Sequence, residues 1–271
     1  MNHLNNFKNQ IRPAAVAGMF YPNDPIKLRD QLELFLQGDS SITCQVPSIL
    51  IVPHAGYVYS GIIAGKAYQI LSKWKDHYSH VAILGPPHRE YLTTIGASAA
   101  SEFQTPLGNV KLDTGLINKI VKKMDSISFS DRAHSQEHSL EVQLPFLQFI
   151  LNEFKLLPFL IGDVVPESVS QFIEILLKNA NTLVVISTDL SHYLPYEEAT
   201  DVDENTAEHI EAMNYFKITQ GRACGIWALR GALLYAKKNN LNILRISLQN
   251  SGDTAGSKDQ VVGYGSWVMN P

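Results

Sequence analysis

The chain has 271 residues, 45% of them hydrophobic and 18% charged, which is typical of a globular protein with a substantial core. Its 22 basic and 26 acidic side chains give a formal charge of −4, so its electrostatics do not favour nucleic acid or an anionic membrane as a partner. No apolar run approaches the roughly 18 residues that cross a bilayer, and two cysteines cannot form a disulfide framework, so we expect a cytoplasmic protein.

The predicted elements alternate between helix and strand. The first is a helix that Asn23 or Asp24 can cap, with Pro25 in its first turn and Gly38 after its end. Pro145 is expected to kink a later helix or to set its start. Apolar runs and helical spacing then predict, in chain order, a strand at 48–52, a helix at 62–74, strands at 80–85 and 94–98, helices at 116–124 and 139–151, a strand at 157–162, a helix at 166–177, a strand at 182–187, a helix at 226–238, and strands at 242–248 and 261–269.

This alternation predicts the fold class. Strands that alternate with helices favour an α/β protein, a mostly parallel sheet with helices on both faces. The last two strands, 242–248 and 261–269, are joined by a loop too short for a helix, so they are expected to pair antiparallel. We therefore predict one domain over residues 1–271, built on a mixed, mostly parallel sheet.

Four of the predicted strands run into clusters of polar residues. His54 follows the first strand, His88 follows the second, Asp189 and His192 follow the strand at 182–187, and Asp253 follows the strand at 242–248. Because the carboxyl ends of parallel strands lie along one edge of a sheet, where ligand crevices form, these side chains are expected to face one pocket.

The residue types in these clusters suit a metal ion. Imidazoles and carboxylates bind divalent iron, zinc or copper, and two histidines with one carboxylate are the set found in non-haem iron(II) enzymes. The alternatives are a hydrogen-bonded structural histidine at His54 or His88, a turn or helix cap at Asp189, and an ordinary loop at Asp253.

Further candidates lie outside these clusters. His134 and His138 are four residues apart and share a face if the segment is helical, so His138 is a candidate to line the pocket or bind the metal. Cys224 precedes a predicted helix, where the pKa of its thiol would fall, although a buried cysteine is more often inert. Arg89 would bind an anionic substrate group or remain solvated. No GxSxG, Walker-type or GxGxxG motif is present.

Eight ordered blocks of sequence resemble the Memo-like family and cover nearly the whole chain. They are RPAAVAGMFYP at 12–22, PHAGYVYSG at 53–61, GPPH at 85–88, FQTPLG at 103–108, EHSLEVQLPF at 137–146, STDLSHY at 187–193, NSGD at 250–253 and VVGYGS at 261–266. So many blocks in one order are far more specific than any single motif.

This resemblance implies a fold similar to that of the class III extradiol dioxygenases, with a metal pocket at the strand ends. It implies that His54 and His88 are metal ligands, that Asp189 lines the pocket, and that His192 matches the catalytic acid–base histidine. The dioxygenases use a glutamate as third ligand, and animal Memo offers a cysteine in the stretch corresponding to 250–254. This sequence has neither residue there, which leaves Asp253 as the anionic substitute.

Three functions follow from these observations. We expect a metal-dependent, dioxygenase-like oxidoreductase in which iron(II), or else zinc or copper, is held by His54, His88 and Asp253 while His192 moves a proton. The alternatives are a zinc-type hydrolase with Asp189 or His192 as base, and a non-enzymatic binding or signalling module for a small molecule or peptide. The resemblance also implies a pathway link to AMMECR-type and radical SAM proteins.

Overall fold

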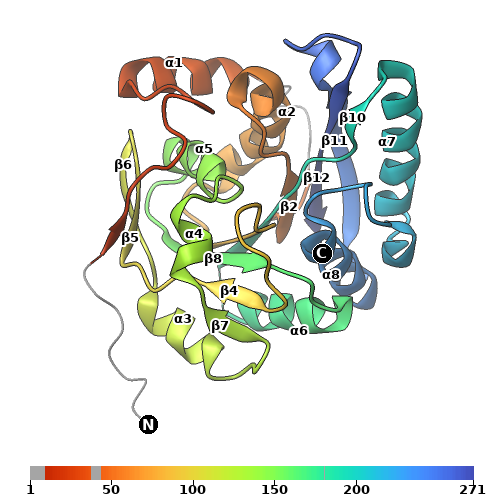
Figure 1. Ribbon diagram of the computed structural model, residues 1–271. Helices are drawn as coiled ribbons and strands as arrows, with labels where there is room; N and C mark the ends of the chain where they lie inside the picture. Colours follow the sequence, from red (N-terminus) through yellow and green to blue (C-terminus); the bar gives the residue numbers. More distant parts are fainter. Residues whose placement is uncertain (1–9, 38–43, 180) are drawn as a thin grey trace.

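A mixed sheet of nine strands forms the centre of the computed structural model, which describes residues 10–37, 44–179 and 181–271 (Figure 1). Its middle consists of four parallel strands, which are almost uninterrupted runs of buried residues because helices cover both faces. In spatial order they are β2 (Ile49–Val52), β9 (Thr182–Ser187), β3 (His80–Gly85) and β8 (Lys155–Ile161).

Antiparallel strands extend this parallel middle on both sides. Beside β2 lies β12 (Val261–Asn270), which also pairs with β11 (Asn242–Asn250) and the short β10 (His192–Leu194). Beside β8 lies β4 (Ile95–Ala97), followed by β7 (Ile127–Phe129). The predicted mixed sheet and the antiparallel pairing of the last two strands are confirmed.

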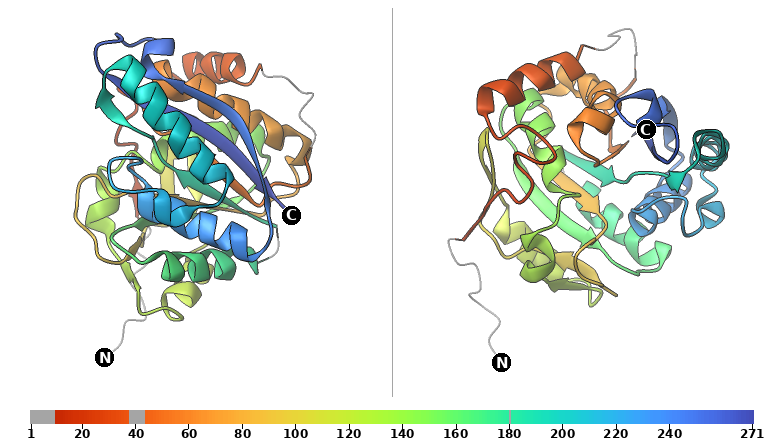
Figure 2. Two further views of the ribbon diagram at one scale, coloured as in Figure 1. Left: turned by 90° about the vertical axis from the view of Figure 1, so that its right-hand side faces the viewer. Right: turned by 45° about the horizontal axis from the view of Figure 1, so that its top comes forward.

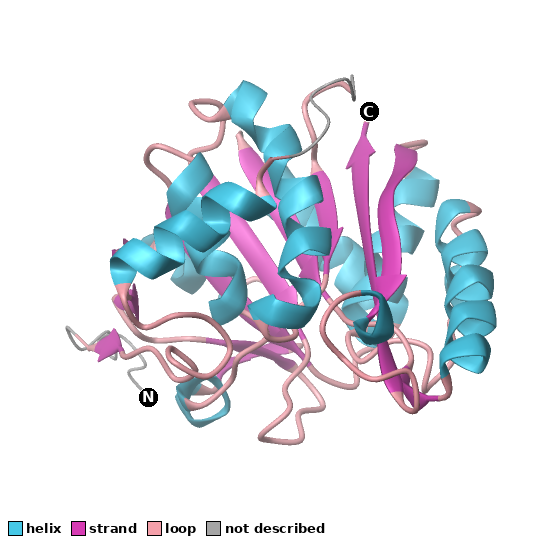
Figure 3. Cartoon of the chain, turned by 90° about the horizontal axis from the view of Figure 1, so that it is seen from above, coloured by secondary structure: helices cyan, strands magenta, loops and turns pink. Residues whose placement is uncertain are grey.

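Helices cover the sheet in two layers (Figures 2 and 3). One layer contains α1 (Pro25–Phe35), α2 (Tyr57–Ile70) and α5 (Leu144–Ile150). The other contains α6 (Pro166–Leu177) and α8 (Ile226–Lys238), while α7 (Tyr196–Glu211) packs on β11 and β12. At the far end of the sheet lie α3 (Thr114–Val121) and α4 (Asp131–Ser135). Among the described residues, no helix combines the length and apolar character that a membrane crossing requires.

Close packing of α1 on α2 depends on a glycine. A Cβ atom added at Gly65 would lie 2.4 Å from the carbonyl oxygen of Phe35, so only glycine permits this approach. The contact fixes α2 against the sheet, and α2 begins three residues after His54. The packing of the two helices therefore helps to place the strand end that carries this histidine.

A small second sheet ties the N-terminal segment to the body of the protein. It consists of β1 (Ile11–Arg12), β5 (Glu102–Thr105) and β6 (Gly108–Lys111), with β1 parallel to β5. This pairing brings Arg12 beside Phe103 and buries its guanidinium group inside the protein.

Several helices differ from the sequence prediction: α2 begins at Tyr57 rather than at residue 62, and no helix was predicted at the position of α4. The helix expected at 139–151 is α5, which begins at Leu144 because Pro145 fits only the first turn; residues Glu141–Gln143 form a short 3-10 helix, η2, instead. Helix α7 was not predicted. Its inward face consists mainly of small and polar residues, which leave no apolar stripe in the sequence: Ala199, Asp203, Thr206, Ala207 and Ile210.

Candidate metal centre

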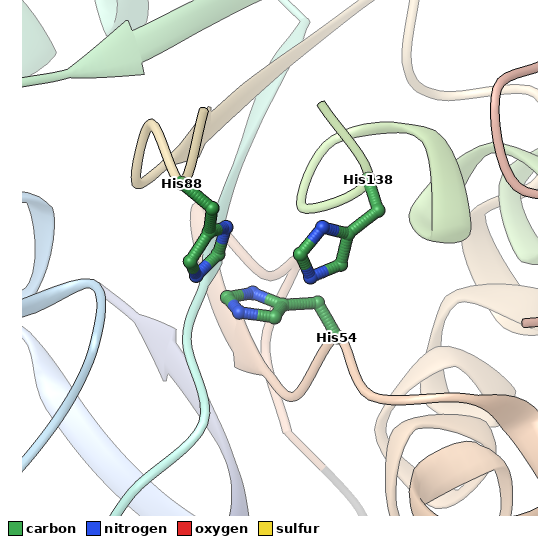
Figure 4. A group of neighbouring side chains, drawn as sticks. All are labelled: His54, His88 and His138. Carbon is green, nitrogen blue, oxygen red and sulfur yellow. The ribbon is translucent and has the colours of Figure 1, made fainter. Parts of the chain in front are cut away.

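Three imidazoles converge at the carboxyl edge of the central strands. The candidate ligand atoms of His54, His88 and His138 all lie within 4.8 Å of one another (Figure 4). The ring centroids of His54 and His88 are 5.1 Å apart, and the rings of His88 and His138 are stacked at 4.5 Å. His54 follows β2 and His88 follows β3, whereas His138 lies in the turn between α4 and η2.

Hydrogen bonding fixes the tautomer of His54, which is buried. Its Nδ1 lies 2.9 Å from the hydroxyl oxygen of Ser187, and that hydroxyl donates its only hydrogen to the carbonyl oxygen of Ser139 at 2.6 Å. Ser187 therefore accepts from His54, so Nδ1 of His54 carries the hydrogen and Nε2 carries the lone pair. Gln143 donates a further hydrogen bond to the same hydroxyl at 2.9 Å.

A buried carboxylate fixes His88 in the same way. Oε1 of Glu137 lies 2.8 Å from Nδ1 of His88, and its Oε2 accepts the backbone N–H of His88 at 2.5 Å. Burial opposes ionisation of Glu137, but the hydrogen bonds from the His88 side chain and from the backbone N–H groups of Ser139 and His88 prevail and lower the pKa of Glu137 to about 2. An ionised carboxylate only accepts, so Nδ1 of His88 donates to it, and in the neutral ring Nε2 carries the lone pair. Carboxylate–histidine pairs of this kind orient metal ligands.

His138 contributes a nitrogen with no hydrogen-bond partner. Its Nδ1 is buried and lies 3.3 Å from Oε1 of Glu137, without the geometry of a hydrogen bond. Burial and the neighbouring His88 lower the pKa of His138 to about 4, and burial with the neighbouring imidazoles holds the pKa of His54 well below its ordinary value. Both rings are therefore neutral near pH 7, as metal ligands must be.

This donor set fits a transition-metal ion. Three neutral imidazoles are a known ligand set for zinc, and imidazole also suits copper, iron and nickel. Two of the rings present Nε2 lone pairs that hydrogen bonds on Nδ1 hold in place, and the third has an unpartnered buried nitrogen. These observations favour a metal ion over a purely structural histidine cluster.

Asp189 and Cys224, both singled out from the sequence, lie beside His54. Oδ1 of Asp189 accepts the backbone N–H of His54 at 2.7 Å, and its Oδ2 is 4.0 Å from Nε2 of His54. Sγ of Cys224 lies 3.2 Å from the same Nε2. Burial raises the pKa of Asp189 to about 7, and burial together with the charge of Asp189 raises the pKa of Cys224 to about 12. The expected fall in the thiol pKa is therefore wrong, because desolvation outweighs the helix start.

His192 and Arg89 are exposed residues near the histidine group. The Nδ1 of His192 is 2.8 Å from the carbonyl oxygen of Leu190, which can only accept, so Nε2 of His192 carries the lone pair. Desolvation and the charge of His88 lower the pKa of His192. The side chain of Arg89 is exposed, and its positive charge is near enough to His138 to lower the pKa of that ring.

Asp253 does not join the histidine group, which corrects the sequence-based expectation of a third ligand there. Its Oδ2 accepts the backbone N–H of Asn250 at 2.9 Å, and its Oδ1 accepts the hydroxyl of Tyr196 at 2.7 Å. These bonds belong to a capping box at the start of η4 (Ser251–Asp253). The carboxylate is therefore used within its own loop, and the third member of the group is His138.

His134 is also separate from the group. Helix α4 ends at Ser135, so His134 and His138 do not share a helix face. Nε2 of His134 donates to the carbonyl oxygen of Gly96 at 2.9 Å. The shared helix face that the spacing of four residues suggested for His134 and His138 is therefore absent.

Two residues that hold the site were missed from the sequence: Glu137 and Ser187. In the sequence, Glu137 could have been recognised as an acidic residue that directly precedes the candidate ligand His138 and a largely apolar, buried segment. Ser187 is one of several hydroxyls at the exit of β9, and only the three-dimensional contact with His54 separates it from ordinary turn residues.

A buried ion pair joins this site to the N-terminal segment. Arg12 Nη1 lies 2.6 Å from Oε2 of Glu141, and the same guanidinium group donates to the carbonyl oxygens of His134 at 2.7 Å and Glu137 at 2.5 Å. The Glu141 carboxylate is saturated by further donors: Tyr21 Oη at 2.7 Å and the backbone N–H groups of Ala15 and Val16 at 2.8 and 3.0 Å. The segment with Glu137 and His138 is therefore pinned by residues 12–21.

Comparisons with known proteins identify the family and agree with the fold. The profile of the Memo-like protein family matches residues 12–268. A MEMO1 family protein of Saccharolobus islandicus strain M.14.25 is 35% identical over 277 residues, which covers 93% of this chain and 97% of that protein. The MEMO1 family proteins of Saccharolobus solfataricus and Sulfolobus acidocaldarius are each 34% identical, covering 93% and 94% of this chain and 97% of each relative.

A solved structure extends the similarity beyond close relatives. An uncharacterised protein from Escherichia coli K12 superposes with a TM-score of 0.54, at 11% identity, over 80% of this chain and 98% of that one. At that identity the likeness concerns the fold alone. The family profile and the archaeal relatives show that the chain belongs to the Memo-like family.

Proposed function

We propose that this protein binds one divalent transition-metal ion on His54, His88 and His138 and acts as a metal-dependent oxidoreductase on a small molecule. The observation that carries the proposal is the fixed tautomer of two imidazoles, because Ser187 and Glu137 accept from each Nδ1 and so leave the lone pair on each Nε2. At His54 the ion would take the place of the Cys224 thiol, which lies 3.2 Å from Nε2. Iron(II) is our preferred ion because imidazole ligands suit iron and because the resemblance to the dioxygenases implies iron; zinc and copper are the alternatives. When bound, the ion would polarise a ligand at an open position.

The protein's own groups around the site have separate tasks in this proposal. His192, which is exposed near the histidine group, presents an Nε2 lone pair and accepts a proton from the substrate. Arg89, exposed near His138, attracts an anionic group of the substrate. Asp189 holds the backbone of His54 through the bond from its N–H, and so keeps the first imidazole in place.

Metal binding and redox chemistry are tested in sequence. Protein purified without oxygen from its own host is analysed for metals, and the apoprotein is titrated with iron(II), zinc and copper. We expect about one ion per chain, lost in His88→Ala and retained in His209→Ala, a control at a half-buried histidine of α7. The iron-loaded protein should then bind nitric oxide, a surrogate for oxygen, with a paramagnetic signal that His192→Ala retains and His54→Ala loses. Failure of the wild-type protein to retain any ion would contradict the proposal.

A zinc-type hydrolase is the second candidate, and one observation favours it. The convergent group contains three imidazoles and no carboxylate, which is the ligand set of some zinc enzymes that activate water. Tight binding of zinc, no reaction of the iron form with nitric oxide, and full activity under strictly anaerobic conditions would support this reading. A protein that keeps its ion, and binds its ligand as well after His192→Ala as before, would instead be a binding module.

The proposed partners rest on the resemblance to the family. An AMMECR-type protein and a radical SAM protein are the candidates. Affinity purification of the chain from its own host, followed by identification of the bound proteins, tests the link.

A further inference from the structure

Three polar residues form a hydrogen-bonded chain at the opposite edge of the sheet from the histidine group. The hydroxyl oxygen of Ser79 lies 2.9 Å from Nδ1 of His80, and Nε2 of His80 lies 3.0 Å from Oδ2 of Asp113. Ser79 and His80 stand where β3 begins, whereas the metal-site residue His88 follows the end of the same strand. The two groups of residues are therefore spatially separate.

The hydrogen bonds of this chain fix the role of each ring nitrogen. Partial burial opposes ionisation of Asp113, but the hydrogen bond from His80 and the backbone N–H of Leu116 lower its pKa. The ionised carboxylate accepts, so Nε2 of His80 donates and Nδ1 is free to accept from Ser79. Asn179 also points an N–H donor at this Nδ1, at 3.2 Å. The order nucleophile, base and orienting carboxylate is that of a serine–histidine–aspartate triad.

Asp113 is held rigidly for this role. It is the N-cap of α3, where its Oδ1 accepts the N–H of Leu116 at 2.9 Å, which leaves Oδ2 for His80. Lys155 Nζ lies 3.5 Å from the same Oδ2. The backbone N–H of Lys155 donates to the carbonyl oxygen of Ser79 at 2.9 Å, so the backbones of these two residues lie side by side.

A cleft of about 700 Å³ opens on this triad, and Ser79 and His80 are part of its wall. Volumes of this size hold small-molecule ligands. The side chain of Ser79 is exposed. The wall also contains three cations, Arg29, Lys111 and Lys155, against one acid, Glu153, with apolar residues between them: Leu107, Val110 and Phe154. Its charge suits a ligand with an apolar body and an anionic group.

We propose that Ser79 is the nucleophile of a second, metal-independent site that hydrolyses small carboxylic esters bearing a negative charge. The Ser79 oxygen forms a bond to the ester carbonyl carbon as its proton passes to Nδ1 of His80. The bond to the alcohol oxygen then breaks, and the alcohol leaves with that proton. Water, deprotonated by His80, attacks the acyl-serine and releases the carboxylic acid. Lys155 offsets the negative charge on the carbonyl oxygen in both steps.

An active-site-directed probe tests the nucleophile. The full-length protein is treated with a fluorophosphonate, and the labelled peptide is identified by mass spectrometry. We expect labelling on Ser79, lost in Ser79→Ala and retained in Ser72→Ala, an exposed serine on the neighbouring 3-10 helix η1 (Leu71–Trp74). No labelling of the wild-type protein, or labelling at another residue, overturns the proposal.

Hydrolysis of 4-nitrophenyl succinate, compared with the uncharged 4-nitrophenyl butyrate, tests the mechanism and the substrate class. We expect the anionic ester to be preferred, and Asp113→Asn to lower the rate about 100-fold while the asparagine preserves the helix cap. The rate should persist after treatment with a chelator. If the chelator abolishes hydrolysis, or if Ser79→Ala retains it, the reaction does not take place at Ser79 and the proposal is overturned. The metal site is tested separately, by the metal titration.

Discussion

The histidine group and the loop at 250–254 have similar sequences of polar residues after a strand, yet they differ in what their hydrogen bonds leave free. At the histidine group, Ser187 and Glu137 accept from Nδ1, so the lone pair of each ring is on Nε2, and at His54 its neighbour is a weak donor, the thiol of Cys224. In the loop, both oxygens of Asp253 are used by Asn250 and Tyr196. Polar residues at the end of a strand are therefore candidate metal ligands only when some of their nitrogen or oxygen lone pairs are not used in hydrogen bonds within the protein.

The largest expected effect contrasts the two regions directly. His88→Ala should lower metal affinity more than about 100-fold, because it removes a ligand and exceeds the 10–100-fold loss typical of an outer partner. Asp253→Ala should leave the affinity within about twofold, because that carboxylate is used inside its own loop. Metal titrations of both variants, followed by competition with a chelator, measure the difference. Equal losses of metal affinity in the two variants would show that the histidine group and the loop do not differ in metal binding.

The second prediction concerns Asp203, which lines the same cleft as Asp253. Burial raises its pKa to about 6, despite the hydrogen bonds that it accepts from Ser191. A raised folded-state pKa gives stability that is complete below the ordinary value of 3.8 and is lost as the pH rises through 6. The loss is on the order of 3 kcal/mol.

Asp203→Asn measures this contribution. The amide keeps the shape of the side chain and both contacts with Ser191 but cannot ionise. We expect the free energy of unfolding of the variant, relative to the wild-type protein, to increase between pH 4 and pH 7. Urea denaturation at several pH values provides the measurement, and a difference that stays constant with pH would show that Asp203 does not titrate in this range.

Glu137→Gln sharpens the comparison within the histidine group. The amide retains the size of the side chain but removes the charge that holds Nδ1 of His88. We expect metal affinity to fall 10–100-fold while the thermal stability of the apoprotein changes much less. Glu90→Gln, a partly exposed acid nearby, is the matched control and should leave the affinity unchanged. An unchanged affinity in Glu137→Gln would remove the support for a carboxylate-oriented ligand.

The smallest effect is expected in the loop. Asn250→Ala removes the side-chain oxygen that accepts the N–H of Gly252 at 2.9 Å, and should lower the free energy of unfolding by about 1 kcal/mol. The metal affinity should not change. Calorimetry and metal titration on the same sample test both statements, and loss of the metal together with the cap would mean that the loop supports the site after all.

The central strands and most helices could be predicted because their signals are local. Apolar runs such as 182–187 coincide with β9, and the helix prediction at 166–177 coincides with α6. By contrast, α7 packs against β11 and β12 through a face that includes Asp203 and Thr206, so burial there does not require an apolar stripe. The position of α7 depends on strands that are distant in sequence, and the local hydrophobic pattern contains no information about them.

The candidate site shows the same limit. Strand order brings His54, His88 and Asp189 to one edge, and this follows from the parallel sheet. The choice between His138 and Asp253 as third member does not follow, because it depends on which polar atoms are already used by neighbours far away in sequence. The types of ligand residue can be predicted from the sequence, but whether a given lone pair is free depends on the hydrogen bonds of the folded protein.

The bond between Arg12 and Glu141 has a consequence for how the protein comes to hold its ion during synthesis. The partners are 129 residues apart, so on the ribosome the arginine leaves the exit tunnel long before the carboxylate exists. Closing so long a loop is costly, and the cost is recovered only when the intervening strands have assembled. A nascent chain that ends before residue 137 lacks one imidazole and the clamp that positions it. If the proposed ion binds, a complete three-imidazole site would therefore form only after the first half of the chain has been translated.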